Sequence, residues 1–126
     1  MIHLVDRLAP LAAADRELQI IGGAFEARIL IGMGAESRLL TVRAGRVIGC
    51  NAAPGFDAAW DFALRGPLAM WEKFTSDPPP PMYNDIWAMR MRVPEFIFEG
   101  NTLIAAQNAR ALTRFIALLR AARAQA

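Results

Sequence analysis

The chain has 126 residues, of which 55% are hydrophobic and 21% charged, and its net charge is +2 at pH 7. This length suits one domain, and so much apolar material can bury a sizeable core, which excludes a disordered chain. No run approaches the roughly 18 apolar residues of a membrane span, and Met1–Arg7 lacks the regions of a signal peptide. We therefore expect a soluble, cytoplasmic protein.

The first half of the chain predicts one short helix followed by strands. Ile2–Ala14 carries apolar residues at helical spacing, with Pro10 expected to bend or restart the helix. Gly22-Gly23 is a break. Three segments after it are rich in β-forming residues or alternate in polarity, and they predict strands at Phe25–Ile31, Ser37–Arg43 and Arg46–Asn51.

The segment Ala58–Arg65 is ambiguous between helix and strand, because its alanines favour a helix. Its periodicity favours a strand, since Trp60, Phe62 and Leu64 alternate with polar or small residues. Gly66 is expected to end this strand.

The remaining elements follow from breakers and capping residues. They are a helix over Leu68–Thr75, a proline-rich link over Ser76–Pro81, a helix capped by Asn84 or Asp85 through Met91, a strand over Glu95–Glu99, and a helix from Thr102 to about Ala122. The order of elements predicts an α+β fold, with a five-stranded mixed or antiparallel sheet covered on one face by helices. We see no second domain.

The positive charges are almost all arginines, and Lys73 is the only lysine. Arginines are scattered among acids up to Glu99, which argues against a nucleic-acid partner. No acidic residue follows Glu99, and the part of the chain after it carries Arg110, Arg114, Arg120 and Arg123. We interpret these four arginines as a solvated face near a helix C-terminus. A patch that faces a membrane or phosphate is the alternative.

The chain carries few groups suited to catalysis. His3 is the only histidine and lies at the N-terminus, so a nucleophile would lack a plausible base. Cys50 is the only cysteine, which excludes an intramolecular disulfide and is typical of a small buried apolar residue. The glycines do not match a phosphate loop and the acids do not match metal-ligand spacing, so we expect no metal or cofactor.

One polar group could still support acid–base chemistry. Asp61, Tyr83 and Asp85 lie near the apolar middle of the chain, and a carboxylate beside an apolar pocket can have a shifted pKa. The simpler interpretation is that Asp61 faces solvent, while Tyr83 and Asp85 begin a helix. A small α+β enzyme that acts on an apolar molecule is therefore one alternative function.

The segment from Trp60 to Gly100 contains more large apolar side chains than a connection needs. Met70, Met82, Met89 and Met91 occur within it, and methionine is common where a surface adapts to varied ligands. A plain core is one explanation, and a ligand cavity is the other. A third is an interaction module that uses the same apolar surface as a dimer interface.

The order of these segments resembles the sterol carrier protein type two family of lipid-binding domains. The segments that carry the resemblance are Asp15–Leu18 leading into Phe25–Ile31, the hairpin Leu39–Asn51, Phe62–Trp71, Pro79–Asp85, and Phe96–Asn101 before the last helix. The resemblance implies an internal apolar tunnel that carries a fatty acyl chain, a sterol or another apolar small molecule, without a metal or redox cofactor. Family members often end in a peroxisomal signal, whereas Ala124-Gln125-Ala126 fits a bacterial or stand-alone protein.

This hypothesis assigns the tunnel wall to large apolar residues of the middle segment. They are Trp60, Phe62, Leu68, Trp71, Phe74, Met82, Ile86, Trp87, Met89, Phe96 and Phe98. A ligand carboxylate could meet Arg65, Arg90 or Arg92 at the mouth. The sequence leaves open whether the carrier forms a homodimer or makes transient contact with membranes.

Overall fold

A five-stranded mixed sheet forms one layer of the computed structural model, which describes residues 1–55 and 57–126. The strands are β1 (Ala27–Met33), β2 (Glu36–Arg43), β3 (Arg46–Asn51), β4 (Phe62–Gly66) and β5 (Ile97–Gly100). Their order across the sheet is β3-β2-β1-β4-β5. β1 runs parallel to β4 and antiparallel to β2, and the outer pairs are antiparallel. The predicted five-stranded mixed sheet is confirmed.

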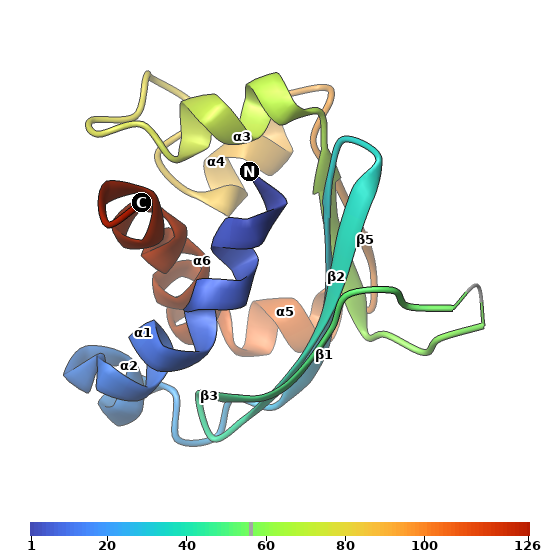
Figure 1. Cartoon of the computed structure of the whole chain (residues 1–126), viewed down its shortest axis with the longest axis vertical. Coiled ribbons are helices and arrows are strands. Elements are labelled where there is room, and N and C mark those ends of the chain that lie inside the picture. Colours follow the sequence, from blue (N-terminus) through green and yellow to red (C-terminus); the bar gives the residue numbers. More distant parts are fainter. Residues whose placement is uncertain (56) are drawn as a thin grey trace.

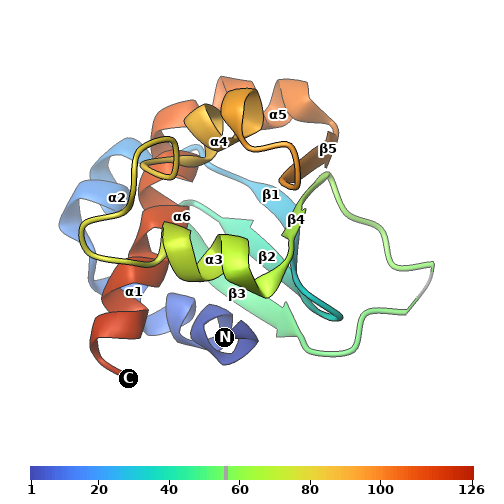
Figure 2. The same cartoon turned by 90° about the horizontal axis from the view of Figure 1, so that it is seen from above.

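The helices form the second layer. They are the 3₁₀ helix η1 (Ile2–Arg7), α1 (Leu8–Ala14), α2 (Arg16–Ile21), α3 (Leu68–Phe74), α4 (Ile86–Arg92), α5 (Thr102–Gln107) and α6 (Ala109–Ala124). The two views in Figures 1 and 2 show these helices on one face of the sheet. The α+β class expected from the sequence is therefore confirmed.

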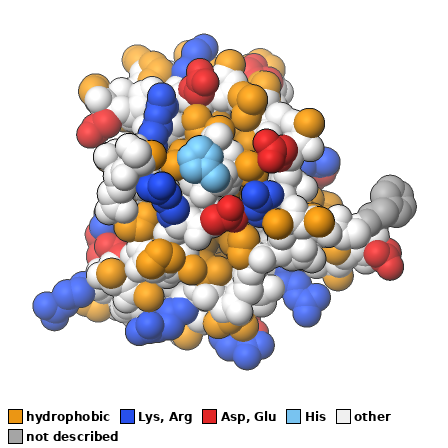
Figure 3. Space-filling model, viewed as in Figure 1, with side chains coloured by type: hydrophobic (Ala, Val, Ile, Leu, Met, Phe, Trp, Pro, Cys, Tyr) orange, Lys and Arg blue, Asp and Glu red, His pale blue; other side chains and the backbone are white. Residues whose placement is uncertain are grey.

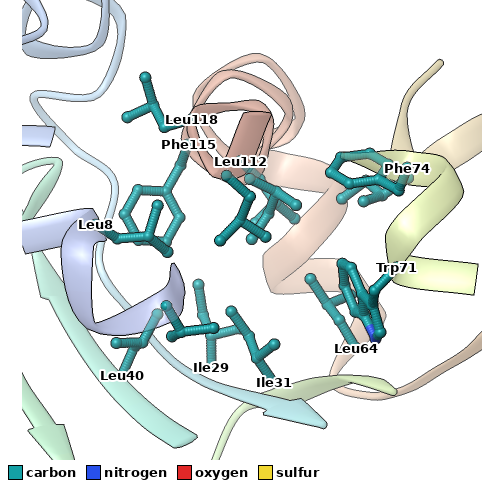
Figure 4. Packing of buried hydrophobic residues seen from close by; sticks show 14 of the residues in the cluster. Leu8, Ile29, Ile31, Leu40, Leu64, Trp71, Phe74, Leu112, Phe115 and Leu118 are labelled. Carbon is teal, nitrogen blue, oxygen red and sulfur yellow. The ribbon is translucent and has the colours of Figure 1, made fainter. Parts of the chain in front are cut away.

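The main core lies between these two layers. Ile29, Ile31 and Leu40 point from the inner face of the sheet and are fully buried, because alternate strand residues face the helices. Leu112 and Phe115 of α6 meet them from the helix layer, as Figure 4 shows. α6 packs closely against η1, α1 and α2, so the two ends of the chain share one core.

Several elements differ from the sequence-based prediction, among them the unpredicted helix α2 and β5, which begins at Ile97 rather than Glu95. The single C-terminal helix is divided at Asn108, whose side-chain amide donates to the Ile104 carbonyl and ends α5. β1 ends two residues later than predicted because the tight turn lies at Gly34, whose φ of +64° suits glycine. β4 begins only at Phe62. Just before it, the backbone N–H of Arg28 in β1 donates to the side-chain carboxylate of Asp61 rather than to a backbone carbonyl, so the regular ladder does not extend to Asp61.

The surface carries charges of both signs. On the face seen in Figure 3, arginine or lysine and acidic side chains surround the single histidine. The interpretation of Cys50 as buried is wrong: it is exposed on edge strand β3, and its thiol donates to Asp6 at 3.5 Å. Among the described residues, no helix is long and apolar enough to cross a membrane.

Candidate ligand-binding site

Six aromatic side chains, five from β4, β5, α3 and α4 and one from the residue just before β5, form a continuous series of ring contacts between the sheet and helices α3 and α4. We call this set, Phe62, Trp71, Phe74, Trp87, Phe96 and Phe98, the aromatic series. Phe98 lies at its centre, with ring centroids 5.3 Å from Trp87, 5.9 Å from Phe62 and 6.0 Å from Phe96. Trp71 extends the series, 6.3 Å from Phe96 and 5.8 Å from Phe74. Contacts at these distances suit stacked or edge-to-face aromatic pairs.

The strands β4 and β5 and the helix α3 position one end of this series. Phe62 and Phe98 face the helices because each lies on the inner side of its strand. Pro67 precedes α3 in an extended conformation, and Trp71 and Phe74 then fall three residues apart on one helix face. The Trp71 indole N–H donates to the buried Gly32 carbonyl at 2.9 Å, which ties α3 to β1.

Helix α4 supplies the other end of the series. Asp85 caps this helix, because its carboxylate accepts from the backbone N–H groups of Trp87 and Ala88, each at 2.9 Å. The Trp87 indole N–H donates to the Thr113 hydroxyl of α6 at 2.8 Å. Trp87 is half-buried, so its ring reaches from the interior to the surface of the helix layer.

The remaining residues predicted to line a tunnel divide into two groups. Ile86 and Met89 of α4 are buried in the same core cluster as Phe62 and Trp71. Leu68 and Met82 are exposed by 48% and 47%, and Trp60 lines a separate groove beside Arg28 and Thr41. The structure thus brings eight of the eleven predicted residues to one region, which comprises the aromatic series with Ile86 and Met89.

A surface groove of 510 Å³ opens beside Trp87, between α2, the start of α4 and α6. We call it the helix-layer groove. Its lining is Glu17, Ile21, Asn84, Asp85, Trp87, Ala109, Arg110, Thr113, Arg114, Ala117 and Arg120. The α6 residues of this groove were missed as site residues. Their signal in the sequence was the acid-free series of arginines, which we had interpreted as a solvated face.

Most of those arginines have defined partners rather than solvent alone. Arg114 forms a two-pronged ion pair with Asp15, its Nε and Nη2 lying 2.9 and 2.8 Å from the two carboxylate oxygens. The hydrogen bonds from Arg114 hold the pKa of Asp15 below its ordinary value. Burial lowers the pKa of Arg120, but an arginine remains charged at neutral pH. Arg110 is exposed and makes no ion pair with a described residue.

The three arginines predicted to meet a ligand carboxylate differ in their surroundings. Arg65 pairs with Glu99 across β4 and β5, so its charge is already matched. Arg90 is exposed and its guanidinium lies 5.1 Å from the centre of the Phe98 ring. Arg92 lies exposed in the last turn of α4. Arg90 is therefore the member of this trio that contacts the aromatic series.

The polar residues considered for acid–base chemistry have separate local roles. The Asp61 carboxylate accepts from the Arg28 backbone N–H at 2.7 Å, whereas Asp85 caps α4. The Tyr83 hydroxyl lies 3.4 Å from a Glu95 carboxylate oxygen. Asp61 and Asp85 line different grooves. Among the described residues, no group of three histidine, cysteine or acidic side chains is placed to hold a metal ion.

Comparisons with known proteins place the fold. No family model matches the sequence, and no curated protein does. Among solved structures, a crystal structure of sterol carrier protein 2 is similar, with a TM-score of 0.73, 15% identity and 95% of each chain covered. A conserved hypothetical protein from Thermus thermophilus, described as possibly a sterol carrier protein, is also similar. Its TM-score is 0.68 and its identity 14%, with 94% of this chain and 87% of that chain covered. A UbiJ-SCP2 ubiquinone synthesis protein has a TM-score of 0.57 and 13% identity, with 86% of this chain and 88% of that chain covered. This chain therefore has the fold of sterol carrier protein 2.

Proposed function

We propose that the protein is a non-catalytic carrier that binds an apolar ligand, a fatty acyl chain, a sterol or a similar lipid, between the sheet and helices α3 and α4. The observation that carries this proposal is the aromatic series, which runs from the core to the helix-layer groove within a sterol carrier protein 2 fold. Met70 and Met89, both buried beside it, can change rotamer to fit ligands of different shape.

The free energy of such binding comes from removing hydrocarbon from water. A sixteen-carbon chain contributes about 12 kcal/mol when buried, at about 0.8 kcal/mol per methylene. Association and ordering cost about 4 kcal/mol or more. At most about 8 kcal/mol remains, which corresponds to a dissociation constant of about 1 μM.

The polar end of an acyl ligand would stay at the surface of the helix layer. Arg90 is the residue we assign to it, because it is exposed, stacks on Phe98 and lies one turn beyond Trp87 on α4. A guanidinium can form a forked pair with a carboxylate. A sterol would meet the same region with a hydroxyl group and would depend less on Arg90.

The alternative functions receive less support. An enzyme would need its acid and base in one site, but Asp61 and Asp85 line different grooves. A dimer interface would need one continuous apolar surface, but the most exposed large apolar residues lie on three different helices: Ile20, Met91 and Leu103. A cytoplasmic location stays part of the proposal, because a single cysteine fits a reducing compartment.

The proposal is tested by titrating lipid-stripped protein with a fluorescent fatty acid and a fluorescent sterol. We expect saturable binding of at least one probe, at one site per chain, with competition by the unlabelled lipid. Phe98→Asp should weaken binding about tenfold or more, because it places a charge in the centre of the aromatic series. Ile48→Asp is the matched control, since Ile48 lies 55% exposed on β3. No saturable binding of either probe would refute the proposal.

A further inference from the structure

Helices α3 and α4 carry half of the aromatic series but lie apart from the closely packed elements. Trp71 and Phe74 belong to α3, and Trp87 belongs to α4. The backbone of α6 approaches η1, α1 and α2 closely, whereas neither α3 nor α4 makes a comparable backbone approach to another element. Side chains must therefore hold these two helices and the link 75–85 in place.

Arg120 of α6 forms the centre of that attachment. Its Nε donates to the Phe74 carbonyl at 2.8 Å, and its Nη2 donates to the carbonyls of Tyr83 and Asn84 at 2.9 and 2.8 Å. Its guanidinium also lies over the Phe74 ring, 4.3 Å from the centroid. One side chain thus joins the end of α3 to the beginning of α4.

Arg123, one helical turn further along α6, adds a second attachment. Its Nη1 donates to the Glu72 carbonyl at 2.8 Å and to the Thr75 hydroxyl at 2.9 Å. The carbonyls of Glu72 and Phe74 belong to the last turn of α3, where the helix itself offers no N–H partner. Arg120 therefore supplies a donor to the Phe74 carbonyl, and Arg123 adds a second donor to the Glu72 carbonyl, which also accepts from the Ser76 hydroxyl at 2.8 Å.

These bonds lie where water can reach them, whereas opening the segment also moves the buried side chains of Trp71, Phe74, Ile86 and Met89. Each joins an arginine to a backbone carbonyl or a hydroxyl, so water can replace the donor when the segments separate. Arg123 is exposed and Arg120 is half-buried, so both lie at the boundary with solvent. The link between the helices contains Pro78–Pro81, a stiff run that favours movement of the segment as a unit.

We propose that residues 68–92 form a lid over Phe62, Phe96 and Phe98, the members of the aromatic series outside this segment, that Arg120 and Arg123 latch this lid to α6, and that an apolar ligand enters when the latch opens. The role in ligand entry depends on the proposed carrier function, whereas the latch itself does not. In the closed structure the rings of Trp71 and Phe96 are in contact. A ligand that enters between α3 and the residue before β5 must separate these two rings.

The latch is tested first without ligand, by hydrogen–deuterium exchange of Arg120→Lys and Arg123→Met. A lysine keeps the charge at position 120 but cannot make the forked contacts, and methionine at 123 keeps an apolar stem. Arg16→Met is the control, because Arg16 lies exposed on α2, outside the helix-layer groove, and makes no ion pair with a described residue. We expect exchange in residues 75–92 to rise about tenfold in at least one latch variant, with β1 unchanged. An equal rise in β1, or no rise in either variant, would overturn the latch.

The second test measures the rate at which a fluorescent fatty acid associates with each variant in stopped flow. If the lid limits entry, association and dissociation should both accelerate in the latch variants by about the factor seen in exchange. The dissociation constant should change much less. A wild-type protein that binds no probe would refute the carrier function, whereas binding with unaltered rates in variants that show faster exchange would refute only the role in entry.

Discussion

Replacing Trp71 with phenylalanine tests how tightly the lid is tied to the sheet. Trp71 is fully buried, and its indole N–H donates to the Gly32 carbonyl at 2.9 Å. The substitution removes a donor from a buried acceptor, which costs about 1–3 kcal/mol. The missing ring leaves a hollow beside Phe74 and Phe96 that costs about 1 kcal/mol more. We expect a loss of about 3 kcal/mol in the free energy of unfolding.

Urea denaturation followed by circular dichroism measures this loss. With a slope of about 1–3 kcal/mol per molar, the midpoint should fall by about 1–3 M. Trp87→Phe is the matched control: its indole donates to Thr113 in a half-buried position, so water can replace the bond and the cost should stay near 1 kcal/mol. A Trp71→Phe variant as stable as Trp87→Phe would refute the assignment of Trp71 as the tie between α3 and β1.

Three further predictions concern the scaffold. Gly100→Ala should lower the free energy of unfolding by about 2 kcal/mol or more, because φ at this position is +101° and a Cβ would lie 2.7 Å from the Trp60 ring. Gly23→Ala, with open space around its Cβ, should be nearly neutral, and thermal or urea unfolding measures both variants. The lowered pKa of Asp15 gives stability that is present above the unfolded pKa of about 3.9 and is lost as pH falls through the lower folded pKa. Asp15→Asn should therefore make stability depend less on pH in this acid range, and an unchanged dependence would contradict the ion pair with Arg114. Partial desolvation and the hydrogen bond to Asp6 raise the pKa of the exposed Cys50 thiol, so iodoacetamide should alkylate it more slowly at pH 8 than it alkylates free cysteine, and an equal rate would contradict that shift.

The sequence predicted most elements because their signals are local. The alternation around Phe62 and Leu64 identified β4, and Asp85 marked the start of α4. The break at Asn108 carries neither proline nor glycine, so periodicity alone extended one helix through it. Helix α2 was not predicted, because its six residues are too few for a clear periodic pattern and its start depends on the cap by Asp15.

The candidate site was predicted less completely because its parts come from distant segments. The aromatic residues lie within one stretch of the chain, so their composition alone suggested a shared region. The groove arginines stood out as an acid-free series, but their partners could not be predicted: Arg114 meets Asp15 across 99 positions, and Arg120 binds backbone carbonyls, which composition cannot reveal. Trp60 was grouped with Phe62 by alternation, but the strand begins only after it, so it lines another groove.

The most direct test of a ligand within the aromatic series is fluorescence quenching by a fatty acid brominated along its chain. In the double variant Trp60→Phe/Trp87→Phe, Trp71 is the only remaining tryptophan and is buried against Phe96. We predict saturable quenching of Trp71, because the bound chain must lie in contact with its ring. Saturable binding that leaves Trp71 unquenched, while Trp60 is quenched in the complementary variant Trp71→Phe/Trp87→Phe, would place the ligand outside this region and contradict the account.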